Sequence, residues 1–155
     1  MLHVSASLFS IFATLAAVTT QDIDKAFLLN NPGLIHARFS TRSRLAIYLP
    51  EPLSFSDQLS DEQAFFLFQN IFKRFSTLEF FPESQVNLVP EEGRFLFRAR
   101  WSFRDRANDD RFVFRLFILL QMEKPASGPL RRNSRSNGPP LPAIWKITEI
   151  KAEKI

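Results

Sequence analysis

The chain has 155 residues, 45% of them hydrophobic, a length that fits one domain with a sizeable core. The absence of Cys excludes disulfides, iron–sulfur clusters, Cys-ligated zinc and thiol catalysis. The net charge is +4, and most of the 20 basic residues are Arg, whose planar guanidinium favours bidentate contacts with anions.

The first 20 residues carry no Asp, Glu, Lys or Arg, and they contain an apolar run from Leu8 to Val18. This run has the length of a signal-peptide core and is short for a membrane span. We therefore predict a signal peptide over residues 1–20, a single domain over residues 21–155, and an exported protein, periplasmic or secreted, with no membrane span after processing. Only His3 and the terminal amine stand where Lys or Arg is usual, so a cytoplasmic protein is the alternative.

Two helices are expected next. The segment from Thr20 to Asn30 has acidic residues in its first turn and apolar residues on one side. Asn31 and Pro32 form an N-cap and first-turn pair, and a second short helix is expected from Leu34 to Phe39.

A strand and a longer helix follow. Apolar residues alternate from Thr41 to Leu49, which predicts a strand with one buried face. Ser60 and Gln63 form a capping box, which predicts a helix that runs to about Phe75 with a wide apolar stripe.

The second half of the chain reads as strands. Short strand-like pieces at Thr77–Phe81 and Val86–Val89 precede two alternating runs that flank a polar turn, which predicts an antiparallel hairpin. The alternating runs are Arg94–Phe103 and Arg111–Gln121. Residues 125–142 are rich in Pro, Gly, Ser, Arg and Asn and are expected to form a mobile loop, and a last strand is expected at Ala143–Lys151. The order α-α-β-α-β-β-β-β predicts an α+β domain with a curved antiparallel sheet and helices packed on one face.

This order resembles the nuclear-transport-factor-2-like superfamily, the cystatin-like cone that is shared with ketosteroid isomerases and limonene epoxide hydrolases. The resemblance spans about Thr20 to Lys154, and the pieces that carry it are Asn30-Asn31, Leu34–Phe39, Ser60-Asp61-Glu62-Gln63-Ala64, the paired long strands and Trp145-Lys146-Ile147. More narrowly, the chain is similar to small exported bacterial proteins of unknown function with this fold. The resemblance implies a sheet that curls around a pocket, and it allows a homodimer, since dimers are common in the superfamily. It implies no particular chemistry, because the scaffold hosts enzymes, binding modules and assembly parts.

Arginines share one side of the predicted hairpin. They are Arg94, Arg98 and Arg100 on the first strand and Arg111 and Arg115 on the second. If the register brings them together, they form a basic face for an anionic partner such as an acidic protein. The alternative is a solvated sheet face whose Arg stems cover apolar surface. Nucleic acid is not expected as a partner, because exposed aromatic residues do not alternate with the arginines.

The 18 Phe residues allow two interpretations. They either line an apolar pocket for a hydrophobic small molecule or fill that space as a solid core. The candidate lining residues are Phe68, Phe72, Phe97 and Trp101. Phe117 and Leu119 fall on the side that carries the arginines, which suggests an interface there, including one with a second copy of the chain.

The sequence assigns no catalytic residue. Tyr48 and His36 are polar residues that could enter the pocket of an isomerase- or hydrolase-like enzyme, but no spacing pairs them. We predict no metal, because the acidic residues at 105, 109 and 110 lack the rhythm of a calcium loop and alternate with arginines. We predict no cofactor, because the sequence has neither a Walker loop nor a GxGxxG fingerprint. The sequence therefore favours a non-enzymatic binding or interaction module, with an enzyme of the same superfamily or a structural homodimer as alternatives.

Overall fold

A computed structural model describes residues 19–83, 87–89, 93–124 and 144–155 of the chain. Residues 1–18 of the predicted signal peptide and the predicted loop at 125–142 lie outside the described residues. Thr19 and Thr20 belong to a helix, and Thr19 is buried.

Helices form where the sequence supplies their caps. Within the described residues, a first helix covers residues 19–28, α2 covers Pro32–His36 and α3 covers Asp61–Arg74. The Asn31 Oδ1 atom accepts hydrogen bonds from the Gly33 and Leu34 amides at 2.9 and 3.2 Å, which starts α2. The predicted capping box is confirmed: the Gln63 amide donates to Ser60 Oγ at 3.2 Å, and the Ser60 amide donates to Gln63 Oε1 at 3.0 Å.

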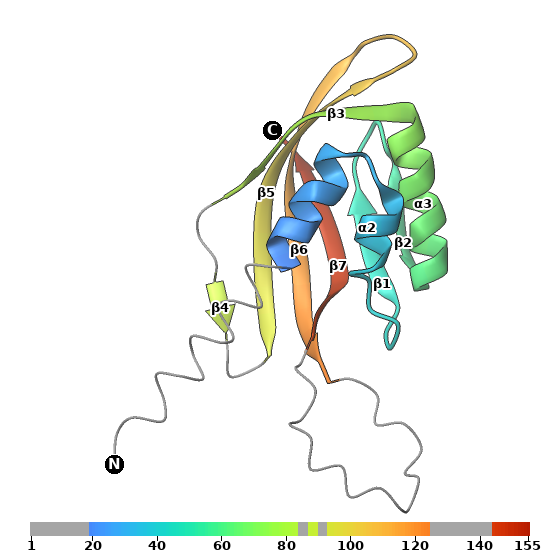
Figure 1. Cartoon of the computed structure of the whole chain (residues 1–155). Helices are drawn as coiled ribbons and strands as arrows, with labels where there is room; N and C mark the ends of the chain where they lie inside the picture. Colours follow the sequence, from blue (N-terminus) through green and yellow to red (C-terminus); the bar gives the residue numbers. More distant parts are fainter. Residues whose placement is uncertain (1–18, 84–86, 90–92, 125–143) are drawn as a thin grey trace, which may run out of the picture.

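Seven strands form one curved mixed sheet in the order β2-β1-β7-β6-β5-β3, with β4 paired to β5 (Figure 1). The strands are β1 Leu45–Leu49, β2 Phe55–Leu59, β3 Phe75–Pro82, β4 Asn87–Val89, β5 Arg94–Asp105, β6 Arg111–Glu123 and β7 Ile144–Lys154. The helices cover one side of this sheet (Figure 1). The predicted α+β class is confirmed.

Several element ends differ from the sequence-based expectation by a few residues; β1, for example, begins at Leu45 and not at Thr41. Three further differences have clear physical reasons. The strand β2 is not predicted, because it is an exposed edge strand without apolar alternation. The pair β1–β7 is parallel, which no local pattern specifies. The helix α2 ends earlier than expected, because the chain after Ala37 runs beside β7, where Phe39 forms a parallel bridge with Ile147.

The predicted hairpin of β5 and β6 is confirmed over eleven paired positions, from Arg94 opposite Gln121 to Arg104 opposite Arg111. We call the side of the sheet that faces the helices the inner face and the opposite side the outer face. The inner face of the hairpin is buried and apolar. Its residues are Phe95, Phe97, Ala99, Trp101, Phe103, Phe114, Leu116, Ile118 and Leu120.

Aromatic rings join the helices to this inner face. The Phe27 ring of the first helix stacks on Phe80 at a centroid distance of 4.6 Å and meets Trp101 edge-on at 5.1 Å. The Trp101 Nε1 atom donates to Thr77 Oγ1 at 2.9 Å, so the polar atom of this buried indole has a partner. Among the described helices, none is long and apolar enough to cross a membrane.

Candidate functional site

The register of β5 and β6 brings arginines together on the outer face. Arg100 lies directly opposite Arg115, and Arg104 lies directly opposite Arg111. Arg98 faces Phe117, two residues from the first of these pairs. We call the outer-face side chains of Arg94, Arg98, Arg100, Arg104, Arg111 and Arg115 the arginine face. It extends from Arg94 to Arg104 on β5, eleven residues, or about 34 Å for ten steps of 3.4 Å.

In the part of the chain that the structure describes, each facing pair has a carboxylate for only one of its two arginines. Arg104 forms an ion pair with Asp109 at 3.2 Å, and Arg115 forms one with Glu83 at 3.1 Å. Arg100, which faces Arg115, and Arg111, which faces Arg104, have no ion-pair partner within the described residues. Like charges directly opposite each other destabilise a sheet, so the two unpaired guanidinium groups are an electrostatic cost to the folded chain.

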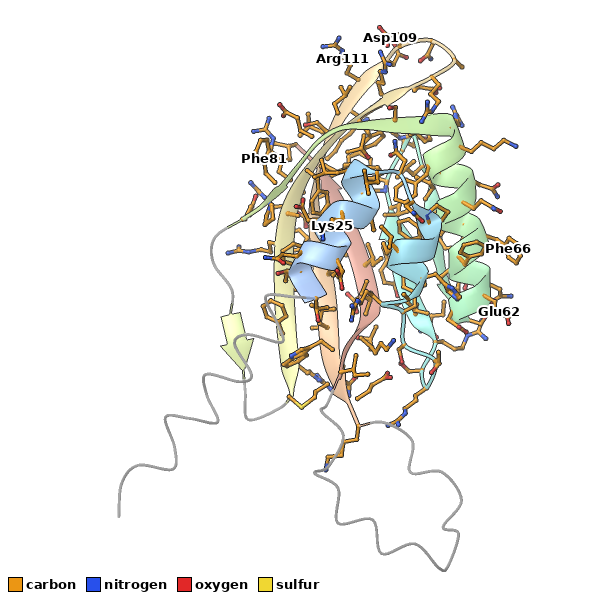
Figure 2. The ribbon with its side chains drawn as sticks, viewed as in Figure 1. Lys25, Glu62, Phe66, Phe81, Asp109 and Arg111 are labelled. Atoms are coloured by element: carbon orange, nitrogen blue, oxygen red, sulfur yellow. The ribbon has the colours of Figure 1, made fainter. Side chains whose placement is uncertain are left out.

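Apolar side chains are interspersed with the arginines. Four outer-face residues of the hairpin are half-buried: Leu96, Val113, Phe117 and Leu119. The Phe81 ring on β3, opposite Arg100, is 56% exposed. Figure 2 places Phe81 on β3 at the margin of the sheet and Arg111 near the tip of the hairpin. The arginine face is therefore a mixed basic and apolar surface.

The predicted pocket residues lie in the core. Phe68, Phe72, Phe97 and Trp101 are each at most 3% exposed. Phe27 meets Phe68 at 6.1 Å and Phe72 at 5.6 Å, and Phe97 meets Phe80 at 6.4 Å. A ligand that contacted these four residues would have to displace packed rings.

The structure does not bring Tyr48 and His36 together. Tyr48 is exposed on β1, between residues whose side chains face the helices, and so lies on the outer face opposite Lys151. His36 ends α2, where its ring lies 5.1 Å from the Phe65 ring and its Nε2 atom lies 3.4 Å from Asp61 Oδ2. The two residues are on opposite sides of the sheet.

Charged groups also meet where β6 ends and β7 begins. Lys146 donates to the Ala37 carbonyl at 2.7 Å, while burial and the nearby Arg38 guanidinium lower the pKa of its amine. Arg38 pairs with Asp22, and Ser40 donates to Glu123. These contacts fasten the first helix and the segment after α2 to the sheet.

Asp24, on the first helix, has an incompletely hydrogen-bonded carboxylate. Burial raises the pKa of Asp24, whose Oδ1 atom is buried and has no hydrogen-bond partner among the described residues. Among the described residues, no group of three or more His, Asp or Glu side chains is placed to hold a metal ion.

Sequence reasoning missed some residues of the arginine face and its margin. The sequence-based prediction ends the first run at Phe103, although Arg104 lies in β5 and continues the alternation of Arg98 and Arg100 at even-numbered positions. Phe81 could not be placed, because a register shift in β3 after Thr77 changes which residues reach the outer face.

No protein-family model and no curated protein matches the sequence. Solved structures do match the fold. A ketosteroid isomerase-like protein from Erwinia carotovora atroseptica matches with a TM-score of 0.61 and 11% identity over 92% of this chain and 95% of that one. A putative scytalone dehydratase from Novosphingobium aromaticivorans matches with a TM-score of 0.61 and 12% identity over 97% and 88% of the two chains.

A third match is described as a nuclear-transport-factor-2-like protein of unknown function in nutrient uptake, from Rhodospirillum rubrum. Its TM-score is 0.57, with 11% identity over 90% of this chain and 97% of that one. These likenesses, together with the curved sheet and its layer of helices, define an α+β protein with helices on one side of a curved mixed sheet. The chain has the nuclear-transport-factor-2-like fold.

Proposed function

We propose that this protein is a non-enzymatic interaction module that binds an acidic protein partner on its arginine face. The observation that carries the proposal is the pairing of Arg100 with Arg115 and of Arg104 with Arg111, where each pair leaves one guanidinium without a carboxylate among the described residues. A partner's Asp or Glu side chains would supply the missing countercharges as bidentate hydrogen bonds.

The apolar side chains of the same surface support a protein partner over a small anion. Leu96, Phe117 and Leu119 lie beside the arginines and are only half-buried in the isolated chain. Protein interfaces combine such an apolar centre with Arg and exclude water from both. A small anion would use the charges and leave the apolar side chains in water.

Charge reversal on the face tests this proposal. The triple variant Arg98→Glu, Arg100→Glu and Arg115→Glu should bind a fluorescent polyglutamate peptide at least about tenfold more weakly than the wild type in low salt. Fluorescence anisotropy measures the binding, and circular dichroism confirms that the variant folds.

The matched control reverses three exposed lysines elsewhere, with the variant Lys25→Glu, Lys73→Glu and Lys124→Glu. Both triple variants change the net charge by the same amount, so the control should keep most of the binding. Equal losses in the two variants would show that only net charge matters, and unchanged binding in the first would refute the proposal. A wild-type dimer that the first variant converts to monomers would identify a second copy as the occupant.

We do not propose an enzyme. Acid–base catalysis needs its groups within reach of one substrate, and Tyr48 and His36 lie on opposite sides of the sheet. The isomerase and dehydratase names of the matching structures describe those proteins, and the identities to this chain are 11% and 12%.

We also propose that the protein is exported, on the basis of the charge-free apolar run in residues 1–20. Mass spectrometry of the product of the full-length gene tests this. A mature mass that lacks about twenty residues is expected for a cleaved signal peptide, and an intact N-terminus on a cytoplasmic product would contradict it.

A further inference from the structure

A hollow of about 410 Å³ opens on the outer face between β3 and the end of the hairpin that carries the turn between β5 and β6. Its lining residues are Leu78, Glu79, Ser102, Arg111, Phe112 and Val113. Glu79 is registered with Ser102, and Ser102 with Val113, so one row of residues crosses β3, β5 and β6 beneath it. Its volume lies within the range of small-molecule sites, which is roughly 300–1,000 Å³.

Two features of the sequence create this hollow. Ser102 has a small side chain, whereas the outer-face residues two positions before and after it on β5 are Arg100 and Arg104. On β3 the register shifts between Thr77 and Glu79, so that Leu78 is an extra residue in the strand. A short side chain at the centre and a bulge at the edge thus leave a depression between taller neighbours.

The walls of the hollow carry opposite charges. Glu79 on β3 and Arg111 on β6, an acid and a base with exposed side chains, are both lining residues. Within the described residues neither takes part in an ion pair, and the Ser102 hydroxyl has no hydrogen-bond partner. Leu78 and Val113 add apolar surface. The lining thus combines a hydroxyl-bearing residue, one acid, one base and apolar residues.

We propose that this hollow binds a small zwitterion with an apolar body, namely an α-amino acid with an aliphatic side chain. Arg111 would hold the ligand's carboxylate, Glu79 its ammonium group and Ser102 a hydrogen bond to either. A simple anion would be repelled by the Glu79 carboxylate, and a simple cation would be repelled by the Arg111 guanidinium. A neutral ligand would remove water from both charged groups without replacing their lost hydrogen bonds. A zwitterion satisfies both walls.

Titration of the wild-type chain, observed by NMR, tests the proposal with three probes that share an aliphatic body. L-leucine carries both charges, 4-methylpentanoate only the carboxylate and 3-methylbutylamine only the ammonium. Leucine should shift the amide signals of Glu79, Ser102 and Val113 and bind about tenfold or more tightly than either analogue, since each charge-assisted contact that is lost costs at least that much. Leucine that shifts none of these signals, or that binds no better than both analogues, would overturn the proposal.

Two substitutions test which lining residue binds the ligand's carboxylate and which binds its ammonium group. Arg111→Gln should weaken leucine and 4-methylpentanoate but spare 3-methylbutylamine, and Glu79→Gln should weaken leucine and the amine but spare the acid. Arg94→Gln, at the other end of the same face, is the matched control and should change none of the three. Leucine affinity that Arg111→Gln leaves unchanged would refute the assigned pose. The partner-binding triple variant changes none of the lining residues, so the two proposals can fail separately.

Discussion

Asp105 shows how one residue can tie two distant elements together. Its side chain is 3% exposed and accepts hydrogen bonds from Arg74 at the end of α3, at 2.9 Å, and from the Ala107 amide, at 2.9 Å. The Ala107 amide, despite the opposing effect of burial and together with Arg74, lowers the pKa of this carboxyl. The sequence alone predicts that Asp105 lies in the polar turn between the two alternating runs, because its partner Arg74 is 31 residues earlier and no local pattern marks the contact.

The lowered pKa of Asp105 makes the stability of the protein depend on pH. The carboxylate stabilises the fold fully above its unfolded pKa, about 3.9, and this contribution is lost as the pH falls through the lower folded value. Asp105→Asn should therefore lower the urea midpoint at pH 7, and its deficit should shrink steadily below about pH 4. Urea unfolding at several pH values measures the gap, and a deficit that stays constant down to pH 2 would contradict an electrostatic role.

At the scale of elements, local signals predicted most of the structure. The capping box at Ser60 and the alternation of the hairpin strands each specify their element within a few residues, and both are confirmed. The signals failed where pairing is long-range. The polar edge strand β2 and the parallel pair of β1 with β7 depend on contacts between distant segments.

The capping box of α3 gives a direct test of a local signal. Ser60→Ala removes the acceptor of the Gln63 amide and should lower the free energy of unfolding by about 1 kcal/mol. Ser60→Asp keeps an acceptor there and adds a negative charge at the helix N-terminus, so it should retain the stability of the wild type. Chemical denaturation of the three proteins measures both effects. Equal losses in the two variants would mean that the serine acts through something other than capping.

At the scale of the whole molecule, the inner face of the sheet forms the core with the helices, and the outer face carries the arginines. Alternation in β5 and β6 separates the apolar residues from the arginines, and the apolar inner face is filled by rings from both layers. The same alternation predicted that the arginines share the outer face, but not which of them face each other, because that depends on the exact register. The hollow at Ser102 could not be predicted at all, because it depends on a bulge in another strand.

If the arginine face serves to bind a partner, repulsion between its facing arginines should lower the free energy of unfolding of the isolated protein. Arg100→Thr removes the like charge opposite Arg115 and should raise the free energy of unfolding by about 0.2–1 kcal/mol in low salt. The gain should fall as salt increases, because screening weakens the repulsion in the wild type.

Arg94→Thr is the control, since Arg94 faces the uncharged Gln121, and it should show no salt-dependent gain. Urea unfolding at 0.02 M and 1 M salt, about 20 and 3 Å in screening length, separates the two cases. A gain for Arg100→Thr that persists unchanged in high salt would come from strand propensity, and would remove the argument that this surface is strained by its own charges.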